Sequence, residues 1–146
     1  MVVAFGLISG VEIDDKTPDQ VVTEGDVFTL SCHMDAGGIE NKDWKFCEWS
    51  RDSDDAKCKY TYEQKMEGWL IKETCDESIE DVTFFGDDPN HENRLCGIVV
   101  PSADRMDNAT WNCRIEGCKY SGCAAEEGSG KFDDGFINVK VAKLVN

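Results

Sequence analysis

Eight cysteines have the most varied chemistry in this chain, since a cysteine can form a disulfide, bind a metal as a thiolate or act as a nucleophile. They are Cys32, Cys47, Cys58, Cys75, Cys96, Cys113, Cys118 and Cys123. A zinc site needs close cysteine pairs or histidines at ligand spacing. This sequence has no Cys-x-x-Cys, and its two histidines, His33 and His91, have no suitable neighbours. An even number of dispersed cysteines is typical of disulfides formed in an oxidising compartment. We therefore expect disulfides, no metal ion and no cofactor.

Catalytic groups are scarce. The two histidines have no matched serine, cysteine or carboxylate in a triad pattern, and oxidised cysteines are not free nucleophiles. Two acidic runs, "RDSDDAK" and "FFGDDPNHEN", raise the question of calcium. Calcium requires about six to eight oxygen ligands in a defined cage, and no twelve-residue Asp-x-Asp-x-Asp-Gly loop occurs. We expect solvated loop carboxylates and a protein that is not an enzyme. The aspartates concerned are Asp52, Asp54, Asp55, Asp87 and Asp88.

The charge balance is strongly acidic, with 30 acidic and 15 basic residues and a formal net charge of −15. Such a surface repels phosphate backbones and anionic lipid headgroups, which argues against nucleic-acid binding. We expect a protein partner, either a basic protein or a second copy of the chain.

The elements that must position these residues follow a strand pattern. Short runs alternate apolar and polar residues and are separated by turns rich in Gly, Asp and Asn. One stretch, "YTYEQKMEGWLIKE", is compatible with a helical turn or with two short strands around Gly68. The pattern predicts one all-β domain. Residues expected to share an inward face are Phe28, Leu30 and Cys32; Cys47 and Trp49; Cys96, Ile98 and Val100; Trp111, Cys113 and Ile115; and Ile137, Val139 and Val141.

The length of 146 residues suits a single domain, which we place at residues 11–146. Residues 1–10, "MVVAFGLISG", are apolar and read as a leader remnant or an extra N-terminal strand. No stretch approaches the roughly 18 apolar residues of a membrane span, so no membrane insertion is expected within the chain. With the cysteine content, this predicts a protein that is secreted or lies on the extracellular face of the cell surface.

Three motifs together carry a family resemblance: "TLSC" ending at Cys32, "CEW" ending at Trp49, and "DNATWNC" ending at Cys113, with "VVTEGDVFTLSC" upstream. The chain resembles an immunoglobulin domain, V-type or a close variant, from about Val11 to Val145. The resemblance implies a two-sheet antiparallel β-sandwich whose sheets are bridged by Cys32–Cys113, with Trp49 packed on the sulfurs.

The resemblance also assigns two residues near the second of these cysteines. Trp111 would stand where the family usually has its corner tyrosine, and Asp107 would be the acid that holds this corner. Two departures favour an invertebrate or otherwise divergent member over an antibody or T-cell receptor. The gap of 17 from Cys32 to Trp49 is long, and "KFDDGFINVKV" lacks a Phe-Gly-x-Gly bulge.

Six cysteines remain, and 15 pairings of them are possible. On the implied sandwich, Cys47 points inward like Trp49, and Cys96 lies on an inner face in the opposite sheet, which favours Cys47–Cys96. Cys118–Cys123 would link two arms of one loop, and Cys58–Cys75 would join the middle hairpins. The alternative set is Cys47–Cys58 with Cys75–Cys96.

Two features suggest modification or recognition. Asn108-Ala109-Thr110 is an N-glycosylation acceptor. The loop from Glu116 to Lys131 corresponds to the third hypervariable-type loop of the family, and its disulfide would pre-organise it for binding. The partner-binding candidates are Lys119, Tyr120 and Ser121 at its tip, and Trp44 and Trp69 elsewhere.

The resemblance implies a binding domain for protein–protein recognition, in cell adhesion or immunity, acting through its loops or through the sheet that contains Trp49. One alternative is a secreted ligand-binding or inhibitory protein with an apolar pocket lined by Trp44, Phe46 or Trp69. Another is an assembly protein that pairs an edge strand such as "VVAFGLISGV" with a neighbouring sheet.

Overall fold

The computed structural model describes residues 12–35, 44–65, 68–86, 95–117 and 131–144. This part of the chain consists of ten β-strands with two short 3₁₀ turns. The elements are β1 (Glu12–Lys16), β2 (Gln20–Thr23), β3 (Phe28–Asp35), β4 (Trp44–Arg51), β5 (Lys57–Lys65), β6 (Gly68–Cys75), η1 (Glu77–Ile79), β7 (Thr83–Gly86), β8 (Leu95–Val100), η3 (Arg105–Asp107), β9 (Ala109–Gly117) and β10 (Lys131–Ala142). The uncertain stretch around Gly68 thus forms two strands, β5 and β6, rather than a helical turn.

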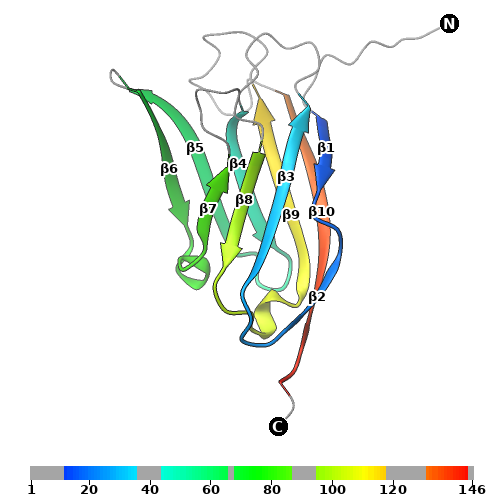
Figure 1. The fold of residues 1–146 in the computed structure, drawn as a ribbon. Helices are drawn as coiled ribbons and strands as arrows, with labels where there is room; N and C mark the ends of the chain where they lie inside the picture. The colour runs from blue at the N-terminus through cyan, green and yellow to red at the C-terminus, as the bar shows by residue number, and fades with distance from the viewer. Residues whose placement is uncertain (1–11, 36–43, 66–67, 87–94, 118–130, 145–146) are drawn as a thin grey trace, which may run out of the picture.

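The strands form two sheets packed face to face (Figure 1). One sheet has four strands in the order β1-β3-β8-β7, and the other has six in the order β2-β10-β9-β4-β5-β6. The prediction of an all-β, two-sheet sandwich with several disulfides is confirmed.

Period-two alternation builds the core, since successive side chains of a strand point to opposite faces. All the predicted inward residues of β3, β4, β8 and β9 are buried, as are Ile137 and Val139 of β10. Phe28 and Trp111 meet across the core edge to face, with ring centroids 6.2 Å apart. The inner faces of both sheets therefore supply one continuous core.

One strand pair departs from the predicted antiparallel sandwich. β2 runs parallel to β10, whereas β1 is antiparallel to β3 in the other sheet. Pro18 lies between β1 and β2 and cannot donate a backbone hydrogen bond. The chain therefore leaves the first sheet here and continues in the same direction to the edge of the second, which becomes a mixed sheet.

Candidate recognition surface

Three disulfides hold the described part of the chain together, and all are pairs expected from the sequence. Cys32–Cys113 and Cys47–Cys96 each join the two sheets, and Cys58–Cys75 joins β5 to β6. Cys118 and Cys123 lie outside the described residues.

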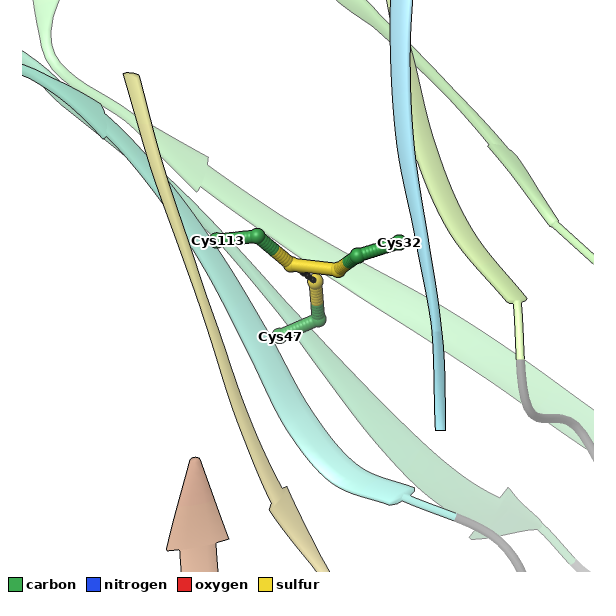
Figure 2. A group of neighbouring side chains, drawn as sticks. All are labelled: Cys32, Cys47 and Cys113. Atoms are coloured by element: carbon green, nitrogen blue, oxygen red, sulfur yellow. Dashed lines mark hydrogen bonds between the residues drawn. A yellow bond between two sulfur atoms is a disulfide. The ribbon is translucent and has the colours of Figure 1, made fainter. Parts of the chain in front are cut away.

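The two bridges between the sheets lie side by side in the core. The Cys47 and Cys113 sulfurs are 3.9 Å apart, and Figure 2 shows the Cys47 sulfur directed at the Cys32–Cys113 bridge. Three sulfurs within 4.8 Å of one another have the proximity of a metal site. Each is oxidised, however, and so offers no thiolate to a metal. The cluster is a double cross-link of the core.

The two tryptophans assigned to the core are fully buried. Trp49 is the cross-strand neighbour of Cys113, which places the indole beside the predicted bridge. Trp111 donates from Nε1 to the backbone oxygen of Asp107 at 3.1 Å. The indole N–H thus donates a hydrogen bond to the upstream backbone, as the hydroxyl of the family's corner tyrosine does.

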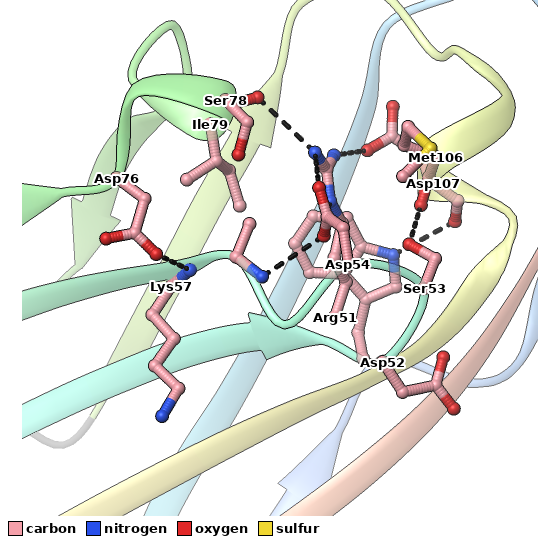
Figure 3. Close-up of polar contacts among 12 residues, drawn as sticks. Arg51, Asp52, Ser53, Asp54, Lys57, Asp76, Ser78, Ile79, Met106 and Asp107 are labelled. Carbon is pink, nitrogen blue, oxygen red and sulfur yellow. Dashed lines mark hydrogen bonds and ion pairs between the residues drawn. The ribbon is translucent and has the colours of Figure 1, made fainter.

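Asp107 belongs to a buried polar cluster centred on Arg51 (Figure 3). Its Oδ1 accepts from Arg51 Nη1 at 2.6 Å, and its Oδ2 accepts from the amide of Asp104 at 2.9 Å. The Arg51 and Asp107 side chains are only 5% and 3% exposed. Arg51 also donates twice to Asp54, at 2.8 and 2.9 Å, and once to the backbone of Ser78.

The electrostatics of the cluster follow from its burial. Desolvation raises the pKa of Asp107, opposed by hydrogen bonding from Asp104 and by the Arg51 charge. The guanidinium of Arg51 lowers the pKa of Asp54, which lies nearer to solvent. The cluster ties the end of β4 to the turn before β9.

Sequence reasoning missed Arg51 and misjudged its acidic neighbours. Asp54 pairs with Arg51, and Asp52 accepts from the amide of Thr110 at 2.9 Å, so neither is a simply solvated carboxylate. The sequence feature that could have indicated this ion pair is the arginine that precedes the three aspartates of "RDSDD". Its partner Asp107 is 56 residues away, which no local pattern reveals. Asp87 and Asp88 lie outside the described residues.

The outer face of the six-stranded sheet, opposite to the core, is the broadest candidate for recognition. Register places Phe132, Asp134 and Phe136 of β10 opposite Glu116, Arg114 and Asn112 of β9. The same rows continue to Phe46, Glu48 and Ser50 of β4, and then to Thr61, Lys59 and Lys57 of β5. These rows thus contain aromatic and acidic residues on β4 and β10, Glu116 and Arg114 on β9, and lysines on β5.

Arg114 organises the centre of this face. It donates from Nε and Nη2 to both carboxylate oxygens of Asp134, at 2.9 and 3.0 Å. Its guanidinium carbon lies 4.4 Å from the ring centre of Phe132, a cation–π contact. The paired guanidinium lowers the pKa of Asp134. The arginine is therefore held in a fixed orientation although its side chain is 43% exposed.

Two aromatic rings on this face stand open to solvent. Phe132 and Phe136 are 54% and 55% exposed, whereas Phe46 is buried, with the Lys59 ammonium 4.2 Å from its ring centre. The predicted pocket lined by Trp44, Phe46 or Trp69 stays a prediction, since Phe46 is the one of the three whose side chain the structure describes. The side chains of Trp44 and Trp69 lie outside the description, as do Lys119, Tyr120 and Ser121.

A histidine–carboxylate pair lies on the other sheet. His33 Nδ1 and Asp14 Oδ1 are 2.7 Å apart in an exposed position, a neighbour that sequence reasoning did not foresee. Ser31 is on the same strand, but its hydroxyl lies 3.2 Å from that of Thr17 and its amide donates to Thr17. Within the described residues no serine is hydrogen-bonded to the imidazole, as a nucleophilic triad would require.

No family model matches the chain, and no curated protein matches it significantly. Among the described residues, no helix has the length and apolar character needed to cross a membrane.

Proposed function

We propose that the chain is a divergent V-type member of the immunoglobulin superfamily. In that family, one sheet has strands A, B, E and D, and the variable type adds two strands to the sheet of C, F and G. The order β1-β3-β8-β7 corresponds to A-B-E-D, and β10-β9-β4-β5-β6 corresponds to G-F-C-C′-C″. The bridge between β3 and β9 beside Trp49 supports the same assignment.

We further propose that the domain works outside the cell in protein–protein recognition, in adhesion or immunity. Its three disulfides support secretion or an extracellular location. The observation that carries the proposal is the exposure of Phe132 and Phe136 beside the oriented Arg114. Aromatic residues and arginine are the types that dominate binding energy at protein interfaces.

The partner is a protein that presents basic groups around an apolar patch. Glu48 and Asp134 lie beside Arg114 in register on this half of the face, and the whole chain carries a net charge of −15. The negative charge attracts a basic protein at long range, whereas it repels a second acidic copy of the domain. In this proposal the domain acts by binding alone and is not an enzyme.

The test is a binding screen of the purified domain against arrayed extracellular proteins and against itself. Each interaction is measured again with F132A/F136A and with V27A, a control that truncates an exposed apolar residue in the turn before β3. Loss of two aromatic anchors should raise Kd by about 30-fold or more, and V27A should change it little.

The salt dependence separates the two kinds of partner. Binding to a basic protein weakens as salt rises, because screening reduces attraction between opposite charges. Self-association of two acidic copies strengthens with salt, and such a result would replace the proposed partner with a second copy. Interactions that resist F132A/F136A, or no interaction at all, would contradict recognition through this face.

A further inference from the structure

The sequon Asn108-Ala109-Thr110 lies beside a groove at the other end of β10. Asn108 follows η3 and is exposed, immediately before β9 begins. Its Oδ1 accepts from the amide of Val141 at 2.8 Å, which fixes the orientation of the carboxamide. No hydrogen bond engages Asn108 Nδ2 within the described residues, so the nitrogen that carries N-linked sugar is available.

The groove has a volume of about 650 Å³, and Asn108 is among the residues that line it. This lies within the usual range of ligand pockets, about 300–1,000 Å³. Its lining mixes hydrogen-bonding groups of Asp19, Asp52 and Lys140 with the side chain of Val21. Polar groups beside an apolar surface suit a sugar ring, which has hydroxyl edges and a C–H face.

Val21 provides an independent observation. The residue is 71% exposed, the most exposed of the large apolar residues described. It lies on the edge strand β2, paired in parallel with Lys140 of β10. A sugar covering this position would shelter both the apolar side chain and the edge of the sheet.

We propose that Asn108 carries an N-linked oligosaccharide whose first sugar residues occupy this groove. The donor class is a lipid-pyrophosphate-linked oligosaccharide. A bond forms between Asn108 Nδ2 and the anomeric carbon of the first sugar, while the bond from that carbon to the pyrophosphate oxygen breaks. The amide nitrogen loses one proton, and the lipid pyrophosphate leaves. No electrons are exchanged with another reactant.

This placement divides the outer face between two roles. The glycan covers the Asn138–Lys140 part of β10, and the recognition residues lie at Phe132–Phe136 of the same strand. The inference does not depend on the proposed partner, since occupancy of Asn108 and contact with the groove are measured on the domain alone.

The test begins with the domain secreted from cells that perform N-glycosylation. Peptide mass spectrometry should find a glycan on Asn108 in the wild type and in T110S, which keeps the sequon, and none in T110V. An unmodified Asn108 in the secreted wild type would overturn the proposal.

Hydrogen exchange then tests the groove. The glycosylated protein is compared with its enzymatically deglycosylated form. It is also compared with the variant N108D, which has no acceptor asparagine and never carries a glycan. Aspartate retains an acceptor for the amide of Val141. Removal of the glycan should accelerate exchange at residues 19–23 and 138–141 by about threefold or more, because those amides lose cover.

A matched control places a glycan elsewhere on the sheet. The variant T110V/K72N removes the natural sequon and creates a new one together with Glu73 and Thr74, on the exposed part of β6, four strands from β10. Removing that glycan should leave residues 19–23 and 138–141 unaffected. Equal acceleration in this control, or no acceleration in the wild type, would overturn contact between the Asn108 glycan and the groove.

Discussion

The buried pair Arg51–Asp107 gives the sharpest energetic prediction, tested by the variants R51M and D107N and their combination. Each single change leaves a polar partner in a site where both side chains are at most 5% exposed. Breaking a buried ion pair by removing one partner typically costs about 3–5 kcal/mol. R51M also removes the hydrogen bonds to Asp54 and Ser78, so its cost should lie in that range.

D107N should be milder, at about 2–3 kcal/mol, because Arg51 retains its two bonds to Asp54. The double variant should lose about as much as R51M alone. The coupling free energy is then about 2–3 kcal/mol, near the upper end of what neighbouring residues show.

The assay is urea unfolding at neutral pH with the disulfides intact, taken around the full double-mutant cycle. Arg114 and Asp134 supply the control, since they form an arginine–aspartate ion pair with two hydrogen bonds but with side chains 43% and 23% exposed. That pair should couple by about 0.2–1 kcal/mol, because solvent screens it. Equal coupling in the two cycles would refute the argument that burial makes the Arg51 pair strong.

Three further changes test the packing, a cross-link and the acid sensitivity of the domain. G97A should cost about 1–3 kcal/mol in urea unfolding, since a Cβ there would overlap the ring of Phe85; an unchanged midpoint would mean that the ring moves freely. C58A/C75A opens a loop with a sequence separation of 17, and the chain-entropy estimate is a loss of about 3 kcal/mol; wild-type stability would contradict the pairing. D134N should make the free energy of unfolding less sensitive to acid. The lowered pKa of Asp134 contributes stability that is present above pH 3.8 and is lost as the pH falls through the folded-state pKa. Urea titrations across that pH range would refute this if the stabilities of wild type and variant decline in parallel.

The parts of the fold that local patterns specify were predictable. Alternation of period two placed Trp111 and Cys113 inward, and the same parity turns Phe132 and Phe136 outward, although they were not recognised as exposed. The bridge beside Trp49 was implied by the family resemblance of the Cys, Trp and Cys motifs, and the register of β4 with β9 places Trp49 directly opposite Cys113.

Contacts between distant segments were not predictable in the same way. Arg51 meets Asp107 only because the end of β4 and the turn before β9 are brought together by the sheet. The switch of the first strand from one sheet to the other at Pro18 depends on the neighbours available at each edge. Both features depend on tertiary packing between segments that are distant in the sequence. No local alternation of apolar and polar residues reveals such contacts.

If the outer face of the six-stranded sheet binds a protein partner, side-chain footprinting of the complex will detect the contact. Phe132 and Phe136, which are more than half exposed in the free domain, should lose most of their labelling when the partner binds, while Val27 should keep its own. Full labelling of both phenylalanines in a saturated complex, with protection at Val27 instead, would contradict it.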